Sequence, residues 1–401
     1  MRHRRNRRAP ALGVARLRME PIRIQLFRPD FGATEQLALQ RVIASGWVGR
    51  GALTVAFERT FAEHLGVAPE LVLALPSATE GLFHGVAMLG LEPGDEVILP
   101  SISFIGAAQA IHAVGAVATL ADVNPHSLNP DVHCLEARRT AQTKAVLLTH
   151  YGGAPCDMKQ IVAWAQAHGI VVIEDSACSP ASRLDDRACG TFGDFAVWSF
   201  DSMKMISTIE GGAIYVRDPA VMARLRRDCC LGMSSAAGHL SEAGARWWEF
   251  DIVAPGRRSL FNDASAALGL EQMKRLPEML ATRQRIHSQY DSRFAEMAGR
   301  GTLGIPPPPS SRAADSHYFY WVQLEGGRRD ALALYLRDHG IYTSFRYFPL
   351  HRTTLFGAVG AALPGSDYAA DSTLNLPCHS MLSVADVDEV ADAVLAFLRT
   401  T

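Results

Sequence analysis

From about residue 23 the chain alternates short apolar runs, rich in β-branched residues, with longer helical stretches. This alternation predicts an α/β protein with a mostly parallel central sheet between helices. Most of the runs are apolar on both faces, which is typical of strands buried between two helix layers. The expected strands are 71–76, 96–100, 117–123, 145–151, 171–175, 195–200 and 212–216.

The pattern changes beyond residue 265, where a long helical run precedes a cluster of prolines at 306–309. A predicted strand at 317–324 and predicted helices at 330–340 and 384–400 follow. This change favours two units, a large domain and a smaller α+β domain. We place their bounds at residues 22–270 and 271–401.

Arginine dominates the start of the chain, where residues 1–18 carry seven arginines and no acid. A nucleic-acid arm or a transit peptide would explain this run, but a disordered tail over residues 1–21 explains it more simply. The net charge of the whole chain is only −2, and charged residues make up 20% of it. This balance is typical of a soluble globular protein and requires neither nucleic acid nor a membrane as a partner.

The cysteine pattern argues against a disulfide framework and against a zinc site. The seven cysteines are scattered, with no C-x-x-C pair and no accompanying histidine spacing. No apolar run approaches the roughly 20 residues that a membrane helix needs. We therefore expect a cytoplasmic protein without a bound metal.

The residues that follow the expected strands are the first place to look for chemistry, because ligands of open α/β sheets bind beyond the carboxyl ends of the strands. After the first strand, Ser77, Ala78 and Thr79 open a helix whose free N–H groups suit a phosphate, although ordinary N-capping is the alternative. After the second strand, the ring of Phe104 either stacks on a planar ligand or belongs to the core.

Two acids, Glu174 and Asp175, end the strand at 171–175. In a dinucleotide-binding protein such an acid binds a ribose, but that interpretation needs G-x-G-x-x-G about 20 residues earlier, and the chain lacks it there. The remaining interpretations are an ion pair with a ligand nitrogen and a cap of the next helix.

Lysine is scarce in this chain, and one lysine stands at the same expected edge of the sheet. Among 39 lysines and arginines, the lysines are Lys144, Lys159, Lys204 and Lys274. A lysine needed only for solubility could be arginine, whereas an amine that forms a carbon–nitrogen double bond cannot, because guanidinium stays protonated and is a poor nucleophile. Lys204 and Ser199 follow the strand at 195–200, so Lys204 is either this amine or a solvated loop lysine. An S-x-x-K acyl-transfer motif is excluded, because Asp201 occupies the serine position.

Together the four strand ends supply an anion site, a ring for stacking, a carboxylate and an amine. Pyridoxal 5′-phosphate requires all four groups. It has a phosphate, a flat ring, a ring nitrogen that acts as an electron sink when protonated beside an acid, and an aldehyde that a lysine captures. The four groups in this order therefore predict a site for this cofactor.

The chain also resembles the DegT/DnrJ/EryC1/StrS family, the sugar aminotransferases of the type I pyridoxal phosphate-dependent transferase fold, over roughly residues 22–400. The motifs that carry the resemblance are RPDFGATE, SGWVGRG, PSATEGL, PGDEVILPSISFIGAAQAI, THYGGAPCDM, IEDSACSPAS, GTFGDFAVWSFDSMKMISTIEGGAI, ALGLEQMKRL and YFPLH. Many motifs in one order are far more specific than a single fingerprint.

The resemblance implies that Lys204 holds the cofactor as a Schiff base and later moves a proton. It implies that Asp175 pairs with the pyridine nitrogen and that Phe104 stacks on the ring. The implied phosphate ligands are Ala78, Thr79 and Ser199.

The resemblance further implies a homodimer in which the partner subunit completes each active site. The substrate would be a keto sugar, usually nucleotide-linked, such as a 3- or 4-keto-6-deoxy sugar or a related keto-cyclitol. Glutamate would donate the amino group, with pyridoxamine 5′-phosphate as the intermediate form of the cofactor. The product would serve surface polysaccharide or secondary-metabolite biosynthesis.

Two positions depart from the family pattern. Cys178 stands where the family commonly has glutamine near the cofactor's phenolic oxygen, and a thiol is a weaker hydrogen-bonding group. The family motif N-Y-R-M, whose asparagine reaches the phosphate in the neighbouring subunit, is replaced by RRSLFND, so we expect Arg258 to take that role.

The resemblance leaves two other functions open. A sugar dehydratase of the same fold has histidine in place of the lysine, and a non-catalytic pyridoxal phosphate-binding regulator could contact DNA through the basic N-terminus. A substrate pocket over the cofactor, or a purely structural role, explains a further set of residues: Trp47, His150, Arg346, Tyr347 and His351.

Overall fold

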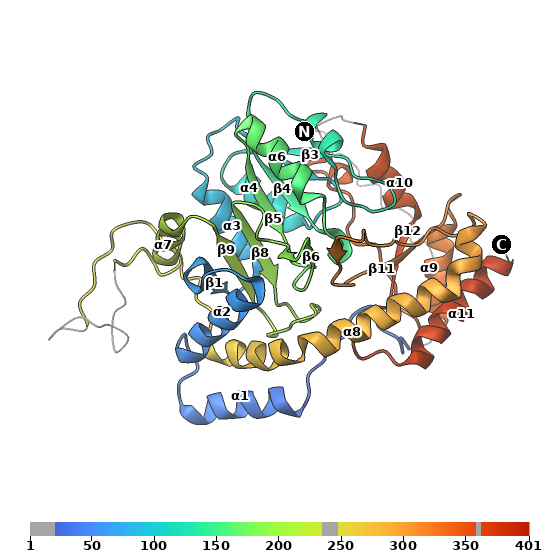
Figure 1. Ribbon diagram of the computed structural model, residues 1–401, viewed down its shortest axis with the longest axis horizontal. Helices are drawn as coiled ribbons and strands as arrows, with labels where there is room; N and C mark the ends of the chain where they lie inside the picture. The colour runs from blue at the N-terminus through green and yellow to red at the C-terminus, as the bar shows by residue number, and fades with distance from the viewer. Residues whose placement is uncertain (1–20, 235–247, 358–361, 401) are drawn as a thin grey trace, which may run out of the picture.

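The computed structural model describes residues 21–234, 248–357 and 362–400, and its central feature is a seven-stranded sheet (Figure 1). The strand order is β1-β9-β8-β5-β4-β2-β3, and β9 runs against the direction of the other strands. The strands are β1 (Val72–Leu75), β2 (Glu96–Pro100), β3 (Val117–Ala121), β4 (Thr143–Thr149), β5 (Val171–Asp175), β8 (Phe195–Ser199) and β9 (Gly212–Val216). The expected α/β class with a mostly parallel central sheet is therefore confirmed.

Helices cover both faces of this sheet. Helices α3, α4 and α7 pack on one face, where they meet side chains such as Leu75 and Val197. Helices α2, α6 and α8 cover the other face, against side chains such as Ala74 and Trp198. The bounds of the helices in this part are α1 (Ala33–Ser45), α2 (Ala52–Leu65), α3 (Ala78–Met88), α4 (Ile105–Ala113), α5 (Val132–Glu136), α6 (Met158–His168) and α7 (Pro219–Asp228). Alternate residues of each strand point to opposite faces, so each strand contributes to both cores.

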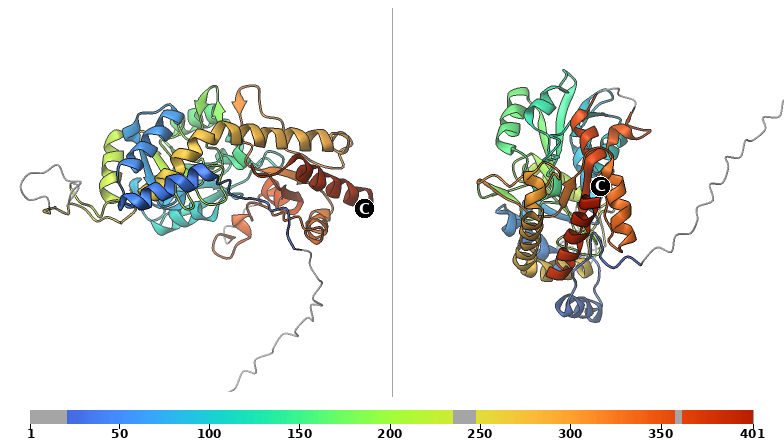
Figure 2. Two further views of the ribbon diagram at one scale, coloured as in Figure 1. Left: turned by 90° about the horizontal axis from the view of Figure 1, so that it is seen from below. Right: turned by 90° about the vertical axis from the view of Figure 1, so that its right-hand side faces the viewer.

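A long helix, α8 (Asp263–Gly299), connects this layered part with the C-terminal elements (Figure 1). Figure 2 shows α1 alongside α8, and the two helices are in contact. The C-terminal elements are β11 (Tyr320–Gln323), α9 (Arg328–Asp338), α10 (Pro364–Ser372), β12 (Thr373–Leu376) and α11 (Val384–Thr400). Their core is a separate cluster around the antiparallel pair of β11 and β12.

The expected domain boundary at residue 270 falls inside α8, so one helix belongs to both sides of the division. The bounds 22–270 and 271–401 stay a prediction. The predicted tail at 1–21 lies, up to residue 20, outside the described residues. Among the helices of the described ranges, none is long and apolar enough to cross a membrane.

Several elements differ from the sequence-based expectation. A small sheet, which was not expected, joins β6 (Arg183–Leu184), β7 (Arg187–Ala188) and β10 (Ala313–Ala314). The strand expected at 317–324 begins only at Tyr320, because His317 has a left-handed φ of 49° and the backbone N–H groups of Tyr318 and Phe319 both donate to Gly152 O. The chain therefore turns here before it enters the strand. Short 3₁₀ turns lie at Pro69–Leu71, Tyr151–Gly153 and Leu350–Arg352.

A buried polar cluster fixes α1 against α8. The Glu35 side chain, in a residue that is 1% exposed, accepts hydrogen bonds from Gln272 Nε2 at 2.8 Å and Arg275 at 2.9 Å. Gly32 N–H donates to the same carboxylate at 2.8 Å. Burial alone would raise the pKa of Glu35, but these bonds outweigh burial and lower it to about 2. The carboxylate is therefore charged and fully bonded at neutral pH.

We predict that Glu35→Gln lowers the free energy of unfolding by about 1–3 kcal/mol at neutral pH, because it removes one of the two carboxylates that bind the Arg275 guanidinium and leaves only Asp30. The folded-state pKa of Glu35 is below its ordinary value, so the charged form stabilises the fold above the ordinary value, and this contribution is lost as the pH falls toward 2. Urea unfolding of wild type and variant, measured between neutral and acidic pH, tests this.

Glu63→Gln is the matched control, because Glu63 is an exposed acid on the adjacent helix α2. This change should leave stability within about 0.5 kcal/mol of the wild type. Equal stability of the Glu35 and Glu63 variants at neutral pH would contradict the role given to the cluster.

Candidate functional site

A cavity of about 160 Å³ lies at the carboxyl ends of the sheet strands. Strand pairing explains its position, because β5 lies between β4 and β8, and Asp175 is level with Thr149 on one side and Val197 on the other. Eight of the residues predicted from the sequence line this cavity: Ala78, Thr79, Phe104, Asp175, Ser199, Lys204, Arg346 and Tyr347.

Lys204 is the amine of this cavity. Its Nζ lies 3.6 Å from Cys178 Sγ and 4.9 Å from the centroid of the Tyr318 ring. Burial opposes the charge on the amine, but Cys178, Tyr318 and the Asp175 carboxylate outweigh it and raise the pKa of Lys204 above its ordinary value. Without a ligand the amine is therefore a cation at neutral pH.

Asp175 supplies the carboxyl group, and it ends β5 with only 3% of the residue exposed. Its Oδ1 accepts a hydrogen bond from Ala177 N at 3.0 Å. Burial raises the pKa of Asp175, and the Ala177 N–H, Lys204 and His150 offset only part of this effect. A cationic group of a ligand would favour the charged carboxylate here.

Glu174 precedes Asp175 and points to the opposite face of the sheet. Its carboxylate accepts hydrogen bonds from Gly190 N at 2.8 Å and Gly193 N at 2.5 Å, and it also lies 3.0 Å from His150 Nε2. The strand alternation thus separates a structural acid, Glu174, from one that faces the cavity.

The first turn of α3 forms one wall of the cavity. Ser77 caps the helix by accepting the Glu80 N–H at 3.1 Å, so the N–H groups of Ala78 and Thr79 have no acceptor within the helix. Strand β9 approaches this turn closely, because a Cβ on Gly212 would lie 2.2 Å from Ala78 N. Only glycine fits there, and an anion would meet free N–H groups and the positive end of the helix dipole.

Two aromatic rings narrow the cavity. The Phe104 residue is 38% exposed, although it directly precedes the buried helix α4, and its ring centroid lies 5.9 Å from that of Tyr347. The Tyr347 hydroxyl lies 3.8 Å from Cys178 Sγ. Cys178 therefore contacts both the amine and a phenol of the cavity, although it does not line the cavity surface.

Arg346 brings a positive charge to the cavity. Its guanidinium lies 5.4 Å from the centroid of the Phe27 ring and 3.9 Å from Met203 Sδ. Its Nε is buried and has no hydrogen-bond partner among the described residues. This group is suited to bind an anionic part of a ligand.

His150 and His351 do not line the cavity. His150 is fully buried, and its Nδ1 accepts the Cys156 N–H at 3.1 Å, so its Nε2 carries the proton toward Glu174. His351 Nδ1 lies 2.7 Å from Ser101 Oγ, and its Nε2 lies 3.1 Å from Asp367. Both rings are held in structural hydrogen bonds, and their substrate roles stay predictions.

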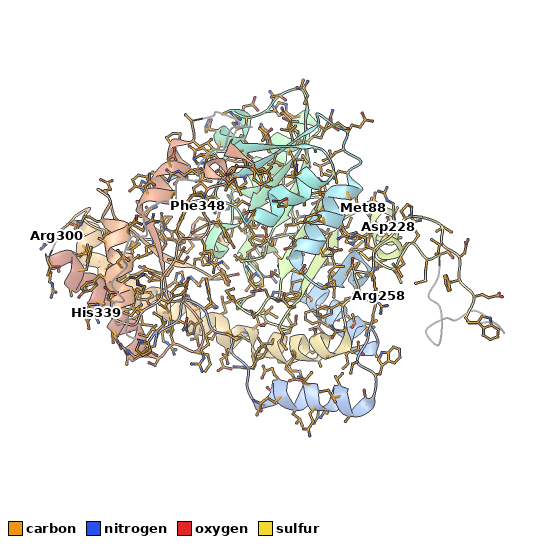
Figure 3. The ribbon with its side chains drawn as sticks, turned by 180° about the vertical axis from the view of Figure 1, so that it is seen from behind. Met88, Asp228, Arg258, Arg300, His339 and Phe348 are labelled. Atoms are coloured by element: carbon orange, nitrogen blue, oxygen red, sulfur yellow. The ribbon has the colours of Figure 1, made fainter. Side chains whose placement is uncertain are left out.

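Trp47 and Arg258 also lie away from the cavity of this chain. Trp47 is in the loop between α1 and α2 and donates its indole N–H to Arg50 O at 3.2 Å. Arg258 is exposed, at the edge of the molecule where Asp228 also lies (Figure 3). The predicted roles of both residues stay predictions.

The cavity includes residues that the sequence analysis did not select. Phe27, Met203, Tyr318 and Phe319 line it. Tyr318 packs under Lys204 and donates its hydroxyl to Met203 O at 3.1 Å. Tyr318 belongs to an aromatic run that is typical of a buried strand. Nothing in this pattern distinguishes Tyr318 as a cavity residue. The cavity contact arises from the turn at His317.

The model of the DegT/DnrJ/EryC1/StrS aminotransferase family matches residues 29–395 of this chain. The chain belongs to this family. It is 44% identical over 370 residues to a dTDP-4-dehydro-2,3,6-trideoxy-D-glucose 4-aminotransferase of Saccharopolyspora spinosa, covering 92% of this chain and 95% of the relative. The crystal structure of the aminotransferase TlmJ from Streptoalloteichus hindustanus is 45% identical, with a TM-score of 0.89 and coverage of 94% and 99% of the two chains.

Solved structures of Spr1654 from Streptococcus pneumoniae, in PMP and PLP forms, are 25% identical with TM-scores of 0.85 and 0.84. They cover 94% of this chain in each case, and 99% and 98% of their own chains. The family resemblance and the expectation of an aminotransferase are therefore confirmed, as is the fold of these enzymes. Within this sugar aminotransferase family, Cys178 and Arg258 remain the departures noted in the sequence.

We predict that Gly212→Ala lowers the free energy of unfolding by about 1–3 kcal/mol, because the new methyl group would overlap Ala78 N and force β9 away from α3. Urea unfolding measures this change. Gly299→Ala is the matched control, because a Cβ at Gly299 would meet nothing within 4 Å at the end of helix α8. The control should be neutral or stabilising by up to about 1 kcal/mol. Two variants of equal stability would contradict the close approach.

Proposed function

We propose that this protein is a pyridoxal 5′-phosphate-dependent aminotransferase that transfers the amino group of glutamate to the C4 keto group of a dTDP-linked deoxy sugar. The observation that carries the proposal is the half-buried Lys204 amine in the same cavity as the buried Asp175 carboxyl. The relative with 44% identity, which acts on a dTDP-4-dehydro sugar, supports the choice of substrate.

The residues of the cavity fit pyridoxal 5′-phosphate. The free N–H groups of Ala78 and Thr79, with the Ser199 hydroxyl, would bind the phosphate. The exposed ring of Phe104 would stack on the pyridine. When bound, the cofactor supplies an electron sink for the negative charge that develops when a proton leaves the carbon bearing nitrogen.

Lys204 has two tasks in this proposal. Its Nζ, after losing a proton, would be the nucleophile that holds the cofactor, a role that arginine could not fill. When the amine is free, the same Nζ would take the proton from the donor's α-carbon and later return a proton to the sugar carbon that receives nitrogen. The Tyr318 ring, 4.9 Å from Nζ, limits the directions in which the amine can move.

Asp175 would hold a proton on the ring nitrogen of the cofactor. Its carboxyl group is buried, so an ion pair with this nitrogen would be screened little by water. The Ala177 N–H bond to Oδ1 at 3.0 Å keeps the carboxyl in one orientation. His150 lies behind it, bonded to Glu174, and supports the strand end from the opposite face of the sheet.

The two substrates are anionic, and the cavity offers a cation for them. Arg346 would bind a carboxylate of glutamate in one half-reaction and an anionic part of the nucleotide sugar in the other. Tyr347 and Phe104 would cover the reacting carbons and exclude water. In this arrangement the amino donor leaves as 2-oxoglutarate before the sugar enters.

We also propose a homodimer, with Arg258 reaching the cofactor phosphate of the partner subunit. Arg258 is exposed, and the segment that leads to it presents apolar side chains at the surface. Phe250, Ile252 and Val253 are 56%, 62% and 52% exposed, an unusual group for a protein that stays monomeric. The cytoplasmic location stays a prediction.

The dehydratase alternative conflicts with Lys204, because that branch of the fold has histidine in place of the lysine. The regulator alternative depends on residues 1–18, which lie outside the described residues. Salt-sensitive DNA binding that disappears when residues 1–18 are deleted, in a protein that does not react with glutamate, would favour the regulator.

We predict that Lys204→Arg lowers the rate of transamination by on the order of 10³-fold, because arginine keeps the charge but cannot form the Schiff base or move the proton. Conversion of glutamate to 2-oxoglutarate by the cofactor-loaded protein measures this. Lys274→Arg is the matched control, since Lys274 is an exposed lysine of α8 paired with Glu271 at 2.7 Å. An equal loss in both variants, or an active Lys204 variant, would contradict the role of Lys204.

We predict that the enzyme, supplied with glutamate, converts a dTDP-4-keto-6-deoxyhexose to a product with the amine at C4. Nuclear magnetic resonance of the product locates the nitrogen. The matched comparisons are the 3-keto isomer and the same 4-keto sugar without its nucleotide, and both should react at least about 10-fold more slowly, a difference of about 1.4 kcal/mol. Amination at C3, or a deoxygenated product without nitrogen, would overturn the proposal.

A further inference from the structure

A second cavity, of about 230 Å³, lies between helix α8, the proline segment and the start of β11. It shares no lining residue with the cavity that contains Lys204. Six of the residues that line it are His287, Asp291, Pro307, Asp315, His317 and Trp321. The transamination chemistry uses none of these side chains.

Three buried polar atoms on the wall of this second cavity have no hydrogen-bond partner among the described residues. They are Nε2 of His287, Nδ1 of His317 and Nε1 of Trp321. Two of the three residues are more than nine-tenths buried, since Trp321 is 3% exposed and His287 is 9% exposed. Buried polar atoms of folded proteins are nearly always paired, so three unpaired atoms around one cavity indicate a missing partner.

The charge state of the cavity limits what this partner can be. Burial, with the charge of Arg283, lowers the pKa of His317 to about 4, and burial with neighbouring groups lowers that of His287 as well. Both imidazoles are therefore neutral at neutral pH. Burial raises the pKa of Asp315 to about 7, and its Oδ1 accepts the backbone N–H of His317 at 2.8 Å.

These groups exclude an anion and a metal ion. No positively charged side chain lines the cavity, and two carboxyl groups, Asp291 and Asp315, would repel an anion. Within the described residues, no group of three or more His, Cys, Asp or Glu is arranged to hold a metal ion. The remaining ligands are neutral molecules that can both donate and accept hydrogen bonds.

Hydroxyl groups meet this requirement. They can donate to a neutral imidazole or a carboxyl oxygen and accept from the Trp321 indole N–H, which is only a donor. The proline rings and the indole offer apolar surface for the C–H face of a saturated ring. The volume is many times the ~15 Å³ that one water molecule needs, so the cavity has room for more than a single water.

We propose that this second cavity is a binding site for a neutral polyhydroxylated ring, a monosaccharide or a compound of the same chemistry, with Trp321, His287 and His317 as its hydrogen-bonding partners. The site is independent of the proposed amination, because it rests on other residues. A failure of either proposal would leave the other unchanged.

The test uses the cofactor-loaded full chain and D-fucose, a neutral 6-deoxyhexose, as the probe in titration calorimetry. The expected result is saturable binding of one sugar per chain. Trp321→Phe keeps an aromatic ring but removes the N–H, and it should weaken binding by about 3- to 10-fold, the effect of one neutral hydrogen bond. Trp164→Phe is the matched control, because its indole donates to Glu136 at 2.8 Å and does not line the cavity.

A second pair of variants keeps the test decisive if Trp321→Phe fails to fold. Ser288→Trp places a large side chain at the cavity from an exposed position of α8, and it should abolish binding of D-fucose without loss of amination. Ser292→Trp, one turn further along the exposed side of α8, should bind the sugar as the wild type does. No saturable binding to the wild type, binding that Ser288→Trp leaves intact, or a crystal structure with only water in the cavity at saturating sugar would overturn the proposal.

Discussion

Strand pairing at one edge of the sheet determines where the reactive groups lie. In the parallel pair of β5 and β8, Asp175 is level with Val197. In the antiparallel pair of β8 and β9, Ser199 is level with Gly212, which in turn faces Leu75 of β1. A slip of one residue would turn every side chain of a strand to the opposite face, so the site exists only in this register. This register brings together the Asp175 carboxyl, the Ser199 hydroxyl, the first turn of α3 and the loop that carries Lys204.

Buried polar contacts hold the loops that connect the strands, which the hydrogen bonds of the sheet do not fix. The loop after Lys204 is tied to α8, because the backbone N–H of Ser207 donates to Gln272 Oε1 at 3.3 Å, and Gln272 also binds Glu35. Asp263, at the start of the same helix, accepts the Thr54 N–H at 2.9 Å and its hydroxyl at 2.7 Å. One helix thus holds α1, α2 and the lysine loop. This explains how a lysine in an irregular segment keeps a defined position beside a buried carboxyl group.

The sequence was sufficient for the parts of the fold that depend on local pattern. The strands expected at 96–100, 171–175 and 212–216 have these bounds in the structure, because each has a core of consecutive apolar residues that turn or polar residues delimit. Strand ends also identified Asp175 and Lys204 as cavity residues. Contacts between distant segments could not be predicted in this way. His150 looked like a cavity residue but binds Glu174 on the other face, and Tyr318 reaches Lys204 only because the backbone turns at His317.

The central claim is that Lys204 is the residue to which the cofactor is attached. Borohydride reduction of the protein loaded with pyridoxal 5′-phosphate makes this attachment permanent, and peptide mass spectrometry then locates it. We predict one modified residue, Lys204, and no modification when glutamate is added before the borohydride. The chain has only three other lysines, Lys144, Lys159 and Lys274, so the assignment is unambiguous. Modification of one of these three, or none at Lys204, would contradict the account.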